Sequence, residues 1–345
     1  MRILSFNIGQ RGLALTLAET TKRGTLIELL ESLGSPEIAC FQEIKTHRTG
    51  LSEHTALAKG YSCYFGCHRI SSNYSGVLTC VRDGIPVHEV QVGLFGSLTH
   101  GIVDLRSFRS AVEGAGALAM DTEGRVLLSD HGVFVLANVY LPALGSSTDP
   151  DSRVAVKAAL CEGLASFVVQ LQAAGRRVVV CGDLNIAHRP VDHCDASTYV
   201  RRRGVPFESD NFRMWLSSIL LSREQIDSLR NEKQQAVLGT SPSVLDPLAL
   251  QRGVRPLLVD SFRCLHPLQP GAYSCWNAAA SSRATNYGTR IDYVLVDAAF
   301  CFAGASDGNS SLPLEANETN HLRELNVTCT GAQNSSSALI PRLAQ

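Results

Sequence analysis

Residues 178–193 read VVVCGDLNIAHRPVDH, and this stretch decides the fold class of the chain. An apolar run typical of a buried strand leads into Gly182, which permits a sharp exit from the strand. Asp183 and Asn185 follow two residues apart, so extended backbone directs both side chains to the same side. A carboxylate can accept a proton from water while an amide donates to a phosphoryl oxygen, which suits a general base beside a transition-state stabiliser. For these residues alone, an Asx-type turn that ends a strand is the simpler alternative.

Apolar runs and helical patterns alternate along the rest of the chain. Strands are expected at 2–6, 37–43, 74–82, 134–142, 177–185 and 290–297, with a weaker one at 324–329. Helices are expected at 25–34, 153–175 and 211–222. Residues 100–130 and 228–256 have weak periodicity and are expected to be insertions that carry loops. Some strands follow one another directly and others are joined by helices, which predicts an α/β sandwich of mixed sheets flanked by helices.

Polar residues that can hold a metal stand at the ends of several expected strands. One strand ends at Asn7, another at Glu43, and a third at Asp183 with Asn185. Because ligands gather beyond the strand ends of open sheets, these side chains could converge on one crevice. Carboxylate and amide oxygens are hard ligands suited to Mg²⁺ or Mn²⁺.

Tyr140 and Asp292 are weaker candidates when taken singly. Tyr140 ends the strand in NVYLP, where a core tyrosine is the commoner explanation than a catalytic phenol. Asp292 lies inside the apolar run RIDYVLV, so it needs a partner that offsets the cost of its burial. His321 is one candidate partner; pairing with Arg290, or exposure to solvent, is the alternative.

The composition limits which partners the chain can have. It has 345 residues, with 31 basic and 32 acidic side chains and a net charge of −1, so a nucleic-acid partner would need a local basic groove. Eleven scattered cysteines indicate reduced thiols rather than a disulfide framework. Cys63, Cys67 and His68 leave a structural zinc site as an alternative. The chain shows no signal segment and no run of about 18 apolar residues, so no membrane partner is expected.

Seven segments in order resemble the exonuclease III family of endonuclease/exonuclease/phosphatase-fold enzymes. They are ILSFNI, FQEIK, YSGV, DTEGRVLL, NVYLP, GDLNIAHRPVDH and NYGTRIDYVL, and they cover roughly residues 1–300. AHRPVDH and the region around NYGTRIDYVL are similar to the second eukaryotic branch of apurinic/apyrimidinic endonucleases. The resemblance implies a DNase I-like four-layer α/β sandwich of two mixed β-sheets flanked by helices. A single catalytic domain would span 1–330, divergent from about residue 303, with a polar tail at 331–345.

The resemblance also implies a role for each matching residue. Asn7 and Glu43 would hold Mg²⁺ or Mn²⁺, and Tyr140 would touch the scissile phosphate. Asp183 would activate the attacking water, Asn185 would stabilise the phosphorane, and Asp292 would orient a catalytic histidine. The resemblance extends the metal-binding set to Asp183, Asn185, Asn320 and His321, and assigns DNA contacts to Arg189, Trp276 and Arg290.

The sequence departs from the family pattern in three places. Gly9 and Gln10 stand where a polar side chain usually follows Asn7. The final Ser-Asp-His motif is replaced by ETNHLRE, which makes His321 the candidate histidine and puts Asn320, a weaker metal ligand than aspartate, before it. Cys275 and Thr289 stand where the first branch has aromatic side chains around the abasic sugar, so a looser pocket is expected.

The resemblance implies a DNA repair nuclease that hydrolyses phosphodiesters at abasic sites and at blocked or recessed 3′ ends. The expected activities are class II apurinic/apyrimidinic endonuclease, 3′–5′ exonuclease and 3′-phosphodiesterase, with the smaller pocket residues favouring 3′-end processing. Double-stranded DNA is the expected partner of a monomer in the nucleus, with mitochondria as the alternative location, and no sliding-clamp motif is visible. The alternatives are a DNA-binding pseudoenzyme of the same fold, or another phosphoesterase of this superfamily.

Overall fold

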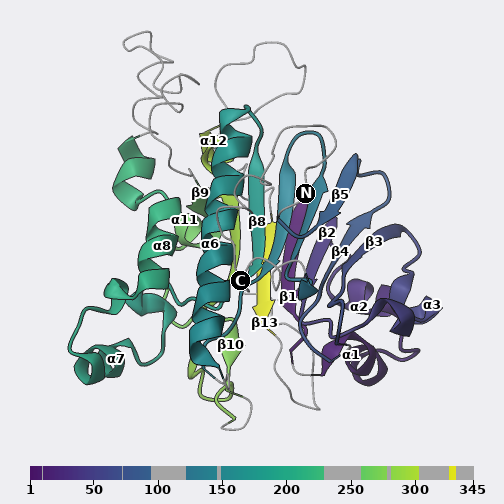
Figure 1. Ribbon diagram of the computed structural model, residues 1–345, viewed down its shortest axis with the longest axis horizontal. Coiled ribbons are helices and arrows are strands. Elements are labelled where there is room, and N and C mark those ends of the chain that lie inside the picture. The colour runs from purple at the N-terminus through teal and green to yellow at the C-terminus, as the bar shows by residue number, and fades with distance from the viewer. Residues whose placement is uncertain are drawn as a thin grey trace.

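Two β-sheets packed face to face form the centre of the protein. The computed structural model describes residues 1–9, 11–71, 73–94, 122–145, 149–228, 258–277, 281–302 and 326–331. The first sheet has five strands in the order β13 (Asn326–Gly331), β1 (Arg2–Asn7), β2 (Ile38–Gln42), β4 (Val77–Arg82) and β3 (Tyr61–Gly66). Strand β13 lies parallel to β1, which confirms the weak strand expected near the C-terminus (Figure 1).

The second sheet has six strands and is also mixed. Its order is β5 (Glu89–Val92), β6 (Val126–Asp130), β7 (Val135–Tyr140), β8 (Val178–Asp183), β12 (Asp292–Asp297) and β9 (Leu258–Asp260). Strands β7 and β8 are parallel, whereas β12 runs antiparallel to β8. A short ribbon of β10 (Cys275–Trp276) and β11 (Gly288–Thr289) stands apart from both sheets.

Helices cover the outer face of each sheet, so the fold has four layers (Figure 1). Helices α1 (Gly12–Thr20), α2 (Leu26–Ser32) and α3 (Glu53–Ala56) lie on the side of the first sheet. Helices α6 (Pro150–Ala173) and α8 (Asn211–Ile219) pack on the second. The shorter helices are α7 (Ala196–Arg203), α11 (Ser261–Leu265), α12 (Ala298–Phe302) and the 3₁₀ turns η1 (Arg48–Gly50), η2 (Pro190–Asp192) and η3 (Phe207–Ser209). The predicted α/β sandwich is confirmed.

Both faces of each central strand are buried. Because side chains alternate along a strand, successive residues point in turn to the covering helices and to the other sheet. In β8, Val178 and Val180 belong to the core beneath α6, whereas Val179 and Cys181 belong to the core between the sheets. Asp183, two residues after Cys181, therefore faces the interior between the sheets. Gly182 is required between them because it has φ +137° and a Cβ there would collide with the carbonyl oxygen of Val139.

Most expected elements are confirmed, with bounds that differ by a few residues. The prediction that 100–130 is a loop insertion is wrong for residues 126–130, because they form the fully buried strand β6. The described residues do not include 100–121 or 229–257, where most of the two predicted insertions lies. Among the described helices, α6 has the length and apolarity of a membrane span, but it packs on the second sheet and contributes to its core.

Candidate active site

The strand ends that carry polar residues meet at one edge of the sandwich. Strands β1, β2, β7 and β8 end there, and β12, antiparallel to β8, begins there with Asp292 opposite Asp183. A cleft at this edge is lined by residues from both sheets and from the β10 ribbon. They are Asn7, Glu43, Tyr140, Ala143, Asp183, Asn185, Ser274, Cys275, Ile291 and Asp292. Six residues expected from the sequence to form a site are therefore brought together.

Asp183 lies at the centre of this cleft and is only 3% exposed. Its Oδ2 accepts a hydrogen bond of 2.8 Å from Nδ2 of Asn7, across the two sheets. Its Oδ1 accepts one of 2.8 Å from the backbone N–H of Asn185. Burial, together with the Glu43 carboxylate, raises the pKa of Asp183 to about 7 despite these hydrogen bonds. The carboxyl group is thus poised near neutral pH, as a general base requires.

Glu43 is held beside Asp183 by the first sheet. Its backbone has φ +57°, which turns the side chain out of β2 toward the cleft. Nδ2 of Asn7 donates to Glu43 Oε1 at 3.1 Å, and Lys45 Nζ lies 3.0 Å from Oε2. Burial and the neighbouring Glu43 raise the pKa of Tyr140 well above its ordinary value, so its hydroxyl stays protonated and can donate a hydrogen bond.

The turn after β8 carries Asn185 in a left-handed conformation with φ +51°. Nδ2 of Asn185 donates to the carbonyl oxygen of Leu141 at 2.8 Å, and its own carbonyl accepts from Nζ of Lys157 at 2.9 Å. Lys157 comes from α6, is 2% exposed and lies 5.0 Å from the ring of Phe212. Burial lowers the pKa of Lys157 to about 8. Sequence reasoning missed this lysine, because it occurs in an otherwise apolar helical pattern.

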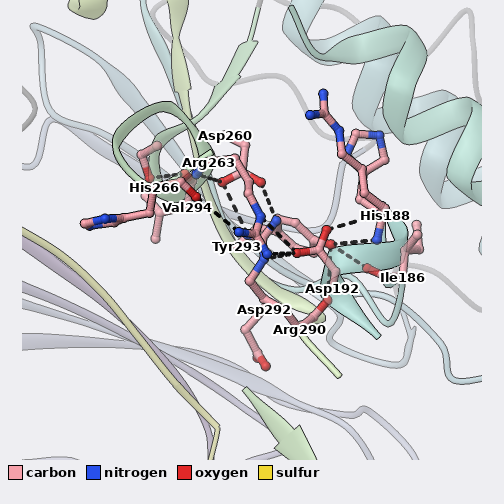
Figure 2. Close-up of polar contacts among 12 residues, drawn as sticks. Ile186, His188, Asp192, Asp260, Arg263, His266, Arg290, Asp292, Tyr293 and Val294 are labelled. Carbon is pink, nitrogen blue, oxygen red and sulfur yellow. Dashed lines mark hydrogen bonds and ion pairs between the residues drawn. The ribbon is translucent and has the colours of Figure 1, made fainter. Parts of the chain in front are cut away.

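Asp292 is buried beside Asp183 and lacks a full set of partners. Its Oδ1 has no hydrogen-bond partner among the described residues. Burial and the nearby Asp183 raise the pKa of Asp292 well above its ordinary value. Figure 2 shows its side chain directed away from Arg290, so the alternative of pairing with Arg290 is wrong. Asp292 is 2% exposed, so the alternative of exposure to solvent is wrong as well. A buried carboxylate oxygen facing a cleft of other carboxylates suits a cation or a protonated side chain.

Arg290 belongs to a buried ion-pair network behind the cleft (Figure 2). It donates to Asp192 at 2.8 Å and to Asp260 at 2.6 Å, and Arg263 donates to the same Asp192 oxygen. Arg290 is 4% exposed and Asp192 is fully buried. The predicted DNA contact by Arg290 is therefore wrong, because its charge is already compensated inside the protein. The network joins the AHRPVDH segment to the start of β12.

His188, in the same segment, is 4% exposed and its Nε2 lies 2.8 Å from the Ser217 hydroxyl. Burial lowers the pKa of His188 to about 4, from an ordinary value of about 6.5. Between these values the unfolded chain binds the proton and the folded one does not, so folding stability falls as the pH falls through this window. This histidine is a neutral structural group.

Replacing His188 by glutamine is expected to reduce the loss of stability in acid. The wild type should lose up to about 3 kcal/mol between pH 7 and pH 4 through this histidine, and His188→Gln should not. Urea unfolding at several pH values measures the difference. The exposed His54, replaced in the same way, is the control and should leave the slope unchanged. Equal pH slopes for His188→Gln and the wild type would contradict this role.

The remaining expected DNA contacts lie nearer the surface. Arg189 is half-buried, and its backbone N–H donates to Asp192. Trp276 is half-buried, its ring lies 5.0 Å from the Arg283 guanidinium, and its indole N–H donates to Asn286. Its neighbour Cys275 lines the cleft.

The two positions singled out as a pocket wall are paired in the structure. Cys275 is the register partner of Thr289 across the β10–β11 ribbon, and Cys275 lines the cleft where the resemblance placed the wall. Burial raises the pKa of the Cys275 thiol to about 12, so this wall is uncharged and small. Gln10, Asn320 and His321 lie outside the described residues.

The side chains present fit a divalent cation only in part. Glu43, Asn7 and the unpaired oxygen of Asp292 are the oxygen donors that a hard cation takes, with water and phosphate filling the other positions. Within the described residues, however, no three His, Cys, Asp or Glu side chains are close enough to hold a metal alone. The zinc alternative is not supported, because Cys63 contacts Cys80, and His68 Nδ1 accepts from the backbone of Ile70 and Ser71.

Comparison with known proteins gives one family match and several relatives. The profile described as "Endonuclease/Exonuclease/phosphatase family" matches residues 4–316. The chain is 33% identical over 309 residues to DNA-(apurinic or apyrimidinic site) endonuclease 2 of Xenopus laevis, covering 86% of this chain and 53% of that protein. It is 32% identical over 316 residues to the Homo sapiens protein of the same name, covering 86% and 54%. The chain thus spans about half the length of these relatives.

Among solved structures, the fold is similar to the crystal structure of the Xenopus laevis APE2 catalytic domain. The TM-score is 0.64 at 29% sequence identity, and the match covers 86% of this chain and 82% of that one.

Proposed function

Since the chain belongs to the endonuclease/exonuclease/phosphatase family, we propose that it is a metal-dependent DNA repair nuclease that acts at 3′ ends and abasic sites. The observation that carries the proposal is the buried Asp183, hydrogen-bonded to Asn7 across the two sheets, in a cleft that also gathers Glu43 and Asn185. Relatives named for apurinic or apyrimidinic sites support DNA as the substrate.

In the proposed reaction each residue of the cleft has a separate task. Asp183 accepts the proton of the attacking water, and the amide of Asn185 stabilises the charged phosphorane. Tyr140, a neutral phenol, donates to a phosphate oxygen. Glu43 and Asn7 would hold Mg²⁺ or Mn²⁺, whose charge neutralises the negative charge that develops on the phosphate. Asp292 orients the histidine that we assign to His321.

Cys275, which lines the cleft, and its register partner Thr289 support a preference for 3′ ends. Neither side chain can stack on a sugar as an aromatic ring would, so an abasic nucleotide turned out of the helix gains little there. A terminal nucleotide needs no such wall, because it can be unpaired at low cost. We therefore propose 3′–5′ exonuclease and 3′-phosphodiesterase action as the main activities, with weaker incision at abasic sites.

We propose that a basic surface on α7 supplies the local charge that the chain as a whole lacks. Arg201, Arg202 and Arg203 are exposed on the last turn of α7. The segment leading into α7 is tied to β11, because Cys194 N–H donates to Gly288 O at 3.0 Å. Since β11 pairs with β10 at the cleft, we propose that this surface contacts the DNA backbone.

Replacing Arg201, Arg202 and Arg203 by glutamine is expected to weaken DNA binding with little effect on single-turnover cleavage at saturation. The slope of log affinity against log salt should fall by up to about 3, one per phosphate contact. Fluorescence anisotropy at several salt concentrations measures it. Lys59→Gln, in the exposed turn before β3, is the control. An unchanged salt slope would exclude this surface from the DNA contact.

Lys157 is expected to position the catalytic turn. Lys157→Met removes the donor to the Asn185 carbonyl and keeps the apolar stem, so the turnover rate should fall about tenfold to a hundredfold while KM changes little. Single-turnover release of the 3′ nucleotide gives the rate, and thermal unfolding verifies the fold. Cys161→Ala, one turn further along α6, is the control. A rate for Lys157→Met equal to that of the wild type would show that the turn needs no such support.

The experiment that tests the proposed function uses a panel of substrates. A duplex with a recessed 3′ end, a duplex with a blocked 3′ end and a duplex with one abasic site are each incubated with Mg²⁺, Mn²⁺ or chelator. Metal-dependent release from the 3′ ends, faster than incision at the abasic site, is expected. DNA binding without cleavage in any metal would select the pseudoenzyme, and activity confined to inositol phosphates would select another phosphoesterase.

A further inference from the structure

Two cysteines face each other across the edge of the first sheet. Cys63 of β3 and Cys80 of β4 are register partners in an antiparallel pair, and their sulfur atoms are 3.5 Å apart. Directly opposed residues in such pairs have Cα atoms roughly 4.5–5.5 Å apart, within the range that a disulfide spans. Closing the bond therefore requires only a small movement of two side chains that already touch.

The two thiols differ in exposure and acidity in the way that a redox pair requires. Cys80 is fully buried, and burial raises the pKa of its thiol well above the ordinary value. Cys63 is half-buried on β3, the edge strand of the sheet, and the hydrogen bond with Cys80 lowers the pKa of its thiol. The accessible sulfur of Cys63 is thus the more nucleophilic one, and the buried sulfur of Cys80 lies in contact with it.

We propose that Cys63 and Cys80 form a reversible disulfide when the protein is exposed to a hydroperoxide. The Cys63 thiolate attacks the peroxide oxygen, which breaks the O–O bond, leaves Cys63 as a sulfenic acid and releases hydroxide or alkoxide. The Cys80 thiol then attacks the sulfenic sulfur, and the disulfide forms as water leaves. Two thiols are oxidised and one peroxide is reduced, and a dithiol reductant reverses the change.

The new bond would tie edge strand β3 to β4, with which it pairs in the sheet. Because the cross-link limits the unfolded chain, the oxidised protein should unfold at a higher temperature than the reduced protein. Neither cysteine lines the cleft, so the site described above and the redox pair are separate features of the fold.

Mass spectrometry of the peroxide-treated native protein tests the proposal. We expect the intact mass to fall by two hydrogen atoms and the Cys63 and Cys80 peptides to be joined until reductant is added. Cys63→Ser should abolish the joined peptide. Cys67→Ser is the matched control, because Cys67 is also half-buried but burial raises its pKa, and it should leave the joined peptide intact.

The contrary results are equally specific. Oxidation of Cys63 to a sulfenic or sulfinic acid while Cys80 remains alkylatable after unfolding would overturn the proposal. So would a disulfide that joins Cys63 to another cysteine, or a joined peptide that persists in Cys63→Ser. An unfolding temperature that does not rise on oxidation would contradict the stabilisation expected of the cross-link.

Discussion

Asp183→Asn is expected to lower the rate of nucleotide release from a recessed 3′ end by about 10²–10⁴-fold, the usual contribution of a general base. Asparagine keeps the shape of the side chain, but its single oxygen can accept from only one of the two donors, Asn7 Nδ2 or the Asn185 N–H, and it cannot take a proton from water. Burial in the cleft raises the pKa of this carboxyl to about 7, so the wild type works as a base near neutral pH.

Single-turnover kinetics with saturating enzyme measures the loss in Asp183→Asn. DNA affinity should change little, because the substitution removes the base and leaves the binding surface. Asp130→Asn is the matched control: Asp130 is a buried aspartate in the same sheet, paired with Arg176 at the far end of β6. A rate within a few-fold of the wild type for Asp183→Asn would remove Asp183 from the reaction.

Arg290→Met is expected to lower the free energy of unfolding by about 3–5 kcal/mol, the cost of leaving buried charges without their partner. Asp192 is fully buried and Asp260 is 7% exposed, and both accept hydrogen bonds from this guanidinium (Figure 2). The Arg290 and Arg263 guanidiniums hold the pKa of Asp192 below its ordinary value although burial acts to raise it. Removing one arginine leaves that carboxylate with a single cation.

Urea unfolding of Arg290→Met gives the change in stability. Arg283→Met is the control, since Arg283 is exposed and its guanidinium lies over the ring of Trp276. Its effect should lie within about 0.5 kcal/mol, as for most surface substitutions. Unchanged stability with lost DNA affinity in Arg290→Met would restore the role of a DNA contact that the sequence suggested for this residue.

The positions of Asn7, Glu43, Asp183 and Asp292 could be predicted because they follow from local patterns. Each stands at the end or start of an apolar strand, and the side-chain period of two directs three of them to the interior between the sheets. Their convergence needed only the rule that strand ends share an edge of the sheet. The resemblance supplied the roles, and the structure supplied the contacts that make those roles feasible.

What the sequence could not show depends on contacts between distant segments. Arg290 is paired with Asp192, 98 positions earlier, so its burial had no local sign. Lys157 donates to the catalytic turn from α6, where the surrounding apolar pattern indicated only a buried helix. The arginines at the end of α7 occur in the sequence as YVRRR, but the link between the segment before α7 and the cleft runs through the distant pairing of β10 with β11.

The measurement that tests the central claim most directly follows the oxygen atom of the attacking water. The wild-type protein is incubated with Mg²⁺ and a duplex with a recessed 3′ end, under single-turnover conditions, in water enriched in heavy oxygen (oxygen-18). The released nucleotide is then analysed by mass spectrometry. If Asp183 activates water for attack on phosphorus, the heavy oxygen will be found in the phosphate of the released nucleotide, and Asp183→Asn will release that nucleotide about 10²–10⁴-fold more slowly. Cleavage that leaves the phosphate unlabelled, or no cleavage by the wild type, would contradict the account.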